Sequence, residues 1–195
     1  MSSRSEVNAA FALLARFEAD QNVAGLISEL GSDVRGRSDS TIVRAQAARI
    51  LGRLRDSRAA PHLIELVADP EPYVRVEALG ALGKLKVRDS LDVISERLAD
   101  PSPLVRGAAA EALGRIGDSS ALGPLHAVLD EDPDAEVRMY AAESLGVLGD
   151  GEIAPRIPDL LKAVSWRVRR HPRWRRLRDF AVNGGRLEVW YRPWD

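Results

Sequence analysis

The residue types that most often carry chemistry are few in this sequence. Its three histidines are His62, His126 and His171, and it has no cysteine. His62 and Glu65 form one H-x-x-E pair at helical spacing, and His126 stands four residues before Asp130. Because a zinc site takes three or four ligands, neither pair is complete. Glycine-rich phosphate loops and the G-x-S-x-G nucleophile motif are also absent. We therefore expect no catalytic residue, no metal and no cofactor.

A second chemically distinctive stretch is WRVRRHPRWRRLRD, residues 166–179. Residues 166–195 contain nine arginines and three acidic residues, a net charge of +6, which leaves −7 for residues 1–165 because the whole chain carries −1. Arginine neutralises phosphates and tryptophan stacks on bases, so this segment could bind nucleic acid in a salt-sensitive way. The candidate basic patch comprises Arg167, Arg169, Arg170, Arg173, Trp174, Arg175, Arg176 and Arg178.

An internal repeat sets the positions of most other residues. The pair Val-Arg recurs at positions 43–44, 74–75, 105–106 and 137–138, with spacings of 31, 31 and 32 residues. An alanine follows each valine by four residues, and Leu-Gly follows at eight and nine residues. Asp-Pro precedes three of the four units. So many matches in one register indicate a genuine repeat, which must be recognised before the fold is predicted.

Each unit is predicted to hold two helices. Val, Ala at +4, Leu at +8 and an apolar residue at +11 place one apolar stripe along the second helix. Pro72 and Pro103 stand at the first helical position, where a missing N–H costs least. Gly117 and Gly149 are expected to end their helices. The expected N-cap positions are occupied by Ser40, Glu71, Ser102 and Asp134.

One such helix pair cannot bury its apolar side alone, so the pairs are expected to stack into a solenoid. The segment DPSPLVRGAAAEALGRIGD, residues 100–118, resembles a short HEAT-like repeat of the type also found in phycobilin lyases. The resemblance covers roughly residues 21–165. It implies an all-α, right-handed α-solenoid whose second helices line a concave face, and it implies binding more often than catalysis. Residues 1–20 are expected to form an N-terminal capping helix.

The surface of the second helices is the main candidate binding site. Its outward-facing positions differ between units whereas the core positions repeat, as expected of a binding surface on a regular frame. A solvated surface whose basic row complements the helix dipoles is the alternative. The candidate binding residues on this concave face are Gln46, Arg49, Arg53, Glu77, Lys84, Glu111, Arg115, Tyr140 and Glu143.

The repeated arginines, Arg44, Arg75, Arg106 and Arg138, could form an anion-binding ladder. We favour a structural role, in which each arginine bonds an aspartate of the preceding inter-helix turn and ties neighbouring units together. Those aspartates are Asp69, Asp100 and Asp132.

The arginine-rich segment also has a structural interpretation. Extending the repeat from Val137 reaches Val168, so a fifth unit begins, with its first helix near residues 156–164. Pro172 then takes the alanine position and breaks the second helix. The sequence around Asn183-Gly184-Gly185 predicts a short β-hairpin. We therefore favour residues 166–195 as a basic, aromatic cap on the solenoid, its arginines paired with acids such as Glu143 and Glu152.

Together these observations favour a non-enzymatic scaffold or adaptor that binds a protein or peptide partner along the concave face. One alternative is nucleic-acid binding through the C-terminal arginines and tryptophan. The other is an enzyme, or a lyase-like helper of one, acting on a pigment or peptide substrate. No apolar run reaches about 18 residues, so no membrane span is predicted. Because the chain has no cysteine, a cytoplasmic location is the simplest expectation.

Overall fold

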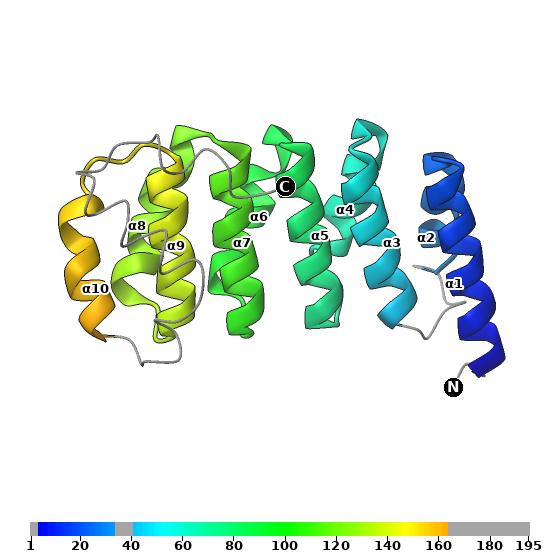
Figure 1. The fold of residues 1–195 in the computed structure, drawn as a ribbon, viewed down its shortest axis with the longest axis horizontal. Coiled ribbons are helices and arrows are strands. Elements are labelled where there is room, and N and C mark those ends of the chain that lie inside the picture. The colour runs from blue at the N-terminus through cyan, green and yellow to red at the C-terminus, as the bar shows by residue number, and fades with distance from the viewer. Residues whose placement is uncertain (1–3, 34–40, 164–195) are drawn as a thin grey trace.

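The computed structural model describes residues 4–33 and 41–163, and these residues form helices joined by short turns (Figure 1). The α-helices are α1 (Arg4–Ala19), α2 (Val23–Asp33), α3 (Thr41–Leu54), α4 (Ala60–Leu66), α5 (Pro72–Leu85), α6 (Leu91–Glu96), α7 (Pro103–Ile116), α8 (Leu122–Glu131), α9 (Ala135–Val147) and α10 (Ile157–Ala163). Short 3-10 segments are η1 (Ser57–Ala59), η2 (Arg88–Ser90), η3 (Arg97–Ala99), η4 (Ser119–Ala121) and η5 (Ala154–Arg156).

The helices are arranged in two layers along one axis. Figure 1 shows α3, α5, α7 and α9 side by side in one layer, with α4, α6 and α8 behind them. The helix α1 packs against α2 and α3 at one end, and α10 follows α9 at the other. This arrangement confirms the predicted all-α solenoid in the part of the chain described here.

The repeated apolar stripe forms the core between the layers. In α7, Val105, Ala109 and Leu113 are fully buried, at 0% exposure. Leu125 of α8 packs into the same continuous cluster. Because the repeated buried positions of the second helices are valine, alanine and leucine, successive helices can approach closely. The stripe read from the sequence is therefore the side of each second helix that the fold buries.

The glycines of the first three Leu-Gly pairs, Gly52, Gly83 and Gly114, mark where second helices touch. A Cβ built on Gly52 would lie 2.8 Å from the backbone Cα of Ala81, and one on Gly114 would lie 2.9 Å from the Cα of Ser144. Real Cβ atoms essentially never come so close to another backbone. The repeat therefore needs glycine here for helix contact between units.

The arginine ladder is structural, as predicted, with one correction to its partners. Arg106 donates from Nε and Nη2 to the two carboxylate oxygens of Asp132, at 2.7 and 2.9 Å, and from Nη1 to the backbone carbonyl of Asp100, at 3.0 Å. The carboxylate therefore comes from the turn of the following unit, whereas the preceding turn offers only its carbonyl. Arg75 repeats the pattern with Asp100 and Asp69. Arg75 and Arg106 each join two turns because a guanidinium has donors on both sides.

The N-caps also differ from the expectation. Ser102 occupies the N-cap position of α7, yet its side chain makes no capping bond. Instead, the carboxylate of Asp100 accepts the backbone N–H of Ser102, at 2.9 Å. Asp134 does cap α9 through its own carboxylate. At the other end of α7, Gly117 takes a φ of 81°, which a residue with a side chain rarely adopts.

Candidate functional site

The candidate binding residues lie on one surface of the second helices, which we call the second-helix face. They occupy equivalent positions of α3, α5, α7 and α9, because the units repeat in register. The basic row is Arg53, Lys84 and Arg115, near the C-terminal ends of these helices. Arg53 is exposed, and Lys84 and Arg115 are half-buried. Their helices lie next to one another, so the row crosses three units.

Lys84 lies in the middle of this basic row. Burial lowers the pKa of its ammonium group, and the positive charges of Arg115, Arg53 and Arg49 lower it further, while Glu77 opposes them. Crowded, partly desolvated cations favour any arrangement that brings a negative charge close to them. The row is therefore chemically suited to an anionic group.

Carboxylates already balance part of this charge. Arg53 reaches both oxygens of Glu18 on α1, at 2.8 and 2.9 Å. Arg115 pairs with Glu111, one turn earlier on α7. The bonds across to α1 and within α7 hold the long arginine side chains in place on the second-helix face.

The remaining candidate residues differ in how far their side chains are buried. Gln46, Arg49, Glu77 and Tyr140 are half-buried. The ring of Tyr140 lies over Gly107, where an added Cβ would be 2.9 Å from its Cδ2. Glu143 is 1% exposed, so the expectation that it lies open on the surface is wrong. The structure places the described candidates along α3, α5, α7 and α9, and all except Glu143 keep exposed area.

An apolar row on the same helices was not anticipated. Ile42, Tyr73 and Leu104 are 53%, 51% and 71% exposed, and each is the second residue of its helix. The equivalent position of α9 is Glu136. The sequence did contain a signal for this row. Each of its residues is apolar and directly precedes a repeated valine, but it falls outside the stripe that the fold buries.

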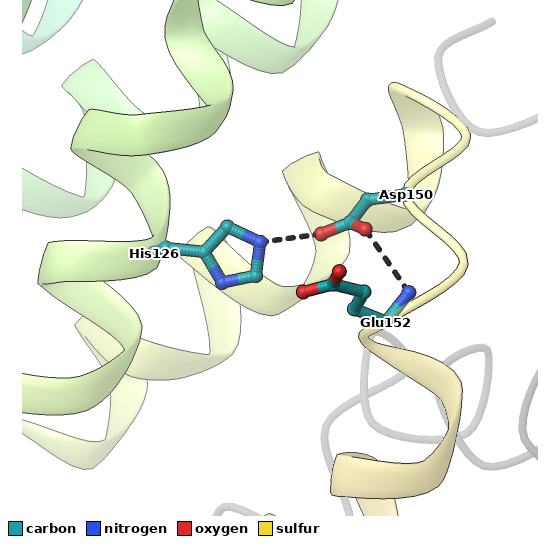
Figure 2. A group of neighbouring side chains, drawn as sticks. All are labelled: His126, Asp150 and Glu152. Carbon is teal, nitrogen blue, oxygen red and sulfur yellow. Dashed lines mark hydrogen bonds and ion pairs between the residues drawn. The ribbon is translucent and has the colours of Figure 1, made fainter.

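Figure 2 shows a separate cluster between α8 and the turn after α9. The Nε2 of His126 lies 2.6 Å from Oδ2 of Asp150, and Oδ1 of Asp150 accepts the backbone N–H of Glu152 at 3.0 Å. The side chain of Glu152 also turns toward the imidazole. One ligand atom from each residue lies within 4.8 Å of the other two, so together they could hold a metal ion.

Arg156 connects this cluster to Asp130. Its guanidinium pairs with the Asp130 carboxylate and lies 3.4 Å from Nδ1 of His126. Local spacing paired His126 with Asp130 directly, but the structure places Arg156 between them. Asp150 and Glu152 could not be paired with His126 from local spacing, because they are 24 and 26 residues away. The basic patch of residues 167–178 and the predicted hairpin lie outside the described residues.

Known protein families contain the same kind of repeat. A family model for HEAT repeats matches residues 23–102 and 60–146. The chain belongs to the HEAT repeat family. No curated protein matches the HEAT-repeat chain at a significant level. None of the helices in residues 4–33 and 41–163 is long and apolar enough to cross a membrane.

Among solved structures, the HEAT-repeat chain is similar to the complex of CpcE and CpcF of phycocyanin lyase from Nostoc sp. PCC7120. The identity is 25%, the TM-score is 0.67, and the match covers 87% of this chain and 70% of that one. Human deoxyhypusine hydroxylase in complex with glycerol matches at 18% identity and a TM-score of 0.34, covering 93% and 96% of the two chains. That TM-score is too low to support an argument. The predicted resemblance to HEAT-like repeats of the phycobilin lyase type is confirmed.

Proposed function

We propose that this protein is a non-enzymatic scaffold or adaptor that binds a protein or peptide partner along the second-helix face. The observation that carries the proposal is the apolar row of Ile42, Tyr73 and Leu104, each more than half exposed at the same position of successive units. Burying exposed apolar surface of this kind is the main driving force for association. A regular row across three units is more than the scattered exposed side chains of an ordinary surface.

The spacing and charge of the rows favour an amphipathic helix as the partner. Packed helices lie about 8–10 Å apart, so neighbouring residues of the row are separated by about that distance. Residues seven apart in a partner helix are separated by about 10.5 Å along its axis, which matches the spacing of the row. The basic row begins eleven residues after the apolar row, which is roughly 16 Å along each helix. A partner helix with apolar residues on one side and acidic residues on the other fits both rows.

The solved relative supports a protein partner. That structure is described as a complex of CpcE and CpcF, two subunits of one phycocyanin lyase. A repeat solenoid also presents an extended surface on which a partner can lie across several units.

Affinity capture with matched surface variants tests the proposal. Leu104→Lys replaces an exposed apolar residue of α7, and Ala127→Lys makes the same change at an exposed position of α8, in the other layer. A partner captured from the native host should be retained by the wild type and by Ala127→Lys but lost with Leu104→Lys. Equal capture by both variants would reject the second-helix face as the binding site.

A second candidate is a lyase-like enzyme, or a helper of one, that handles a pigment or peptide substrate. The similarity to a phycocyanin lyase complex at 25% identity is the observation that favours it. Mixing the purified protein with a free phycobilin should then shift the absorption spectrum of the pigment. An unchanged spectrum would leave the scaffold function as the better explanation.

A further inference from the structure

The junction between the fourth unit and α10 carries three metal-binding side chains that the proposed function does not use. We propose that His126, Asp150 and Glu152 bind one divalent first-row transition metal ion, of which Zn²⁺ is the suitable probe. One imidazole and two carboxylates are a donor set that such ions accept, and three protein ligands leave a coordination position for water. The proposal is independent of the second-helix face.

The turn after α9 brings the ligands together. The bond from the Glu152 N–H to Oδ1 of Asp150 fixes the turn, and Oδ2 is left facing the imidazole of His126. The imidazole and the carboxylate of Asp150 are partly shielded, at 27% and 11% exposure. Glu152 is exposed, so its longer side chain can adjust to complete the coordination.

Metal binding requires a small movement. Bond lengths of about 2.0–2.2 Å around a tetrahedral zinc ion place the ligand atoms about 3.3 Å apart. The Nε2 of His126 and Oδ2 of Asp150 are now 2.6 Å apart and share a hydrogen bond. The ion therefore replaces the shared proton, and the two groups separate by a fraction of an ångström, which side-chain rotation can supply.

The ligand set is specific to this junction. One repeat earlier, the same three positions are Ser95, Asp118 and Ser120. Asp118 accepts the backbone N–H of Ser120 at 3.0 Å, just as Asp150 does for Glu152. The same turn therefore forms in the earlier unit, where serine replaces both His126 and Glu152. The need to form the turn does not explain why His126 and Glu152 are there.

The local charge favours a cation. With a neutral imidazole, the three carboxylates of Asp130, Asp150 and Glu152 and the one guanidinium of Arg156 leave a net charge of −2. A dication at the centre would balance this charge. Opposite charges a few ångströms apart at partly shielded positions attract one another by several times more than in bulk water.

Arg156 competes with the metal. A guanidinium can only donate, so Nδ1 of His126 accepts from it and the ring proton is on Nε2, facing Asp150. A metal at Nε2 moves that proton to Nδ1, which then needs an acceptor in place of Arg156. Metal-bound histidines usually donate this N–H to a carboxylate, and Asp130 lies one helical turn away on α8. Removing the guanidinium should therefore strengthen metal binding.

Isothermal titration of the untagged full-length chain with Zn²⁺ tests the site. We expect one saturable equivalent in the wild type and a loss of at least about tenfold in affinity for His126→Ala and for Glu152→Gln. Arg156→Gln should bind more tightly than the wild type. His62→Ala, which changes a histidine of α4 outside the cluster, should leave the affinity unchanged.

A second readout separates binding at this site from a loss of folding. Glu152 is exposed, so Glu152→Gln should unfold at the wild-type temperature without metal. Zn²⁺ should raise the unfolding temperature of the wild type and of His62→Ala, but not that of Glu152→Gln. The absence of a saturable site, or equal Zn²⁺ affinity in the wild type and in Glu152→Gln, would overturn the proposal.

Discussion

The guanidinium of Arg106 and the carboxylate of Asp132 form a two-point ion pair between successive units, with Nε to Oδ2 at 2.7 Å and Nη2 to Oδ1 at 2.9 Å. Their side chains are only 12% and 4% exposed. Burial acts to raise the pKa of Asp132, but hydrogen bonds from Arg106 and from the Asp134 N–H, with the charges of Arg106 and Arg138, outweigh it and lower the pKa. The pair therefore holds the turns in a defined register.

Arg106→Gln should destabilise the protein by about 3 kcal/mol, because it leaves the buried Asp132 carboxylate without its cation. Chemical denaturation followed by circular dichroism measures the change. Arg58→Gln is the matched control, since Arg58 pairs with Asp56 at the surface and its side chain is 68% exposed. That control should change little. Similar losses in the two variants would show that burial does not set the strength of these pairs.

Acid should weaken the fold partly through Asp132. Because its pKa is lowered in the folded state, its carboxylate stabilises the fold above the unfolded value of about 3.9, and this contribution is lost as the pH falls through the folded pKa. Asp132→Asn should therefore be less stable than the wild type at pH 7, and its free energy of unfolding should fall less as the pH is lowered. The free energies of unfolding of the two proteins should converge towards pH 2. A constant difference between pH 7 and pH 2 would contradict this linkage.

Two glycines of the second helices should respond to alanine in opposite directions. A Cβ on Gly114 would lie 2.6 Å from Oγ of Ser144 and 2.9 Å from its Cα, so Gly114→Ala should cost about 2 kcal/mol by forcing α7 and α9 apart. A Cβ on Gly80 would meet nothing within 4 Å, and alanine there should stabilise α5 by up to about 1 kcal/mol. Thermal unfolding of both variants checks the sign. A stabilising Gly114→Ala would disprove the close contact.

The repeat made most of the fold predictable from the sequence. Val105, Ala109 and Leu113 were identified as core by periodicity, and they are buried because the same stripe recurs in every neighbour. The partners of the arginine ladder were harder to predict. Asp69 and Asp100 are both close to Arg75 in a stacked array, and the sequence cannot show which one offers its carboxylate and which its carbonyl.

The candidate sites were less predictable, since they depend on exposure and on contacts between units. Periodicity separates the buried stripe from the rest of a helix, but it does not measure how open each remaining position is. Leu104 was therefore missed although it is 71% exposed, and Glu143 was expected at the surface although it is buried. The cluster at His126 combines residues from two units, so it became visible only when α8 and the turn after α9 were placed together.

The proposed C-terminal cap predicts that the chain is more stable with residues 166–195 than without them. Repeat arrays need a terminal element over their last apolar side, and the charges of +6 and −7 in the two parts attract each other. A chain ending at residue 165 should unfold at a lower temperature than the full chain. Added salt should reduce this difference in unfolding temperature, because screening weakens the attraction between the two parts. Equal unfolding temperatures at low salt would rule out the cap and leave the arginines available for another ligand, which binding to random-sequence RNA across a salt series would then detect.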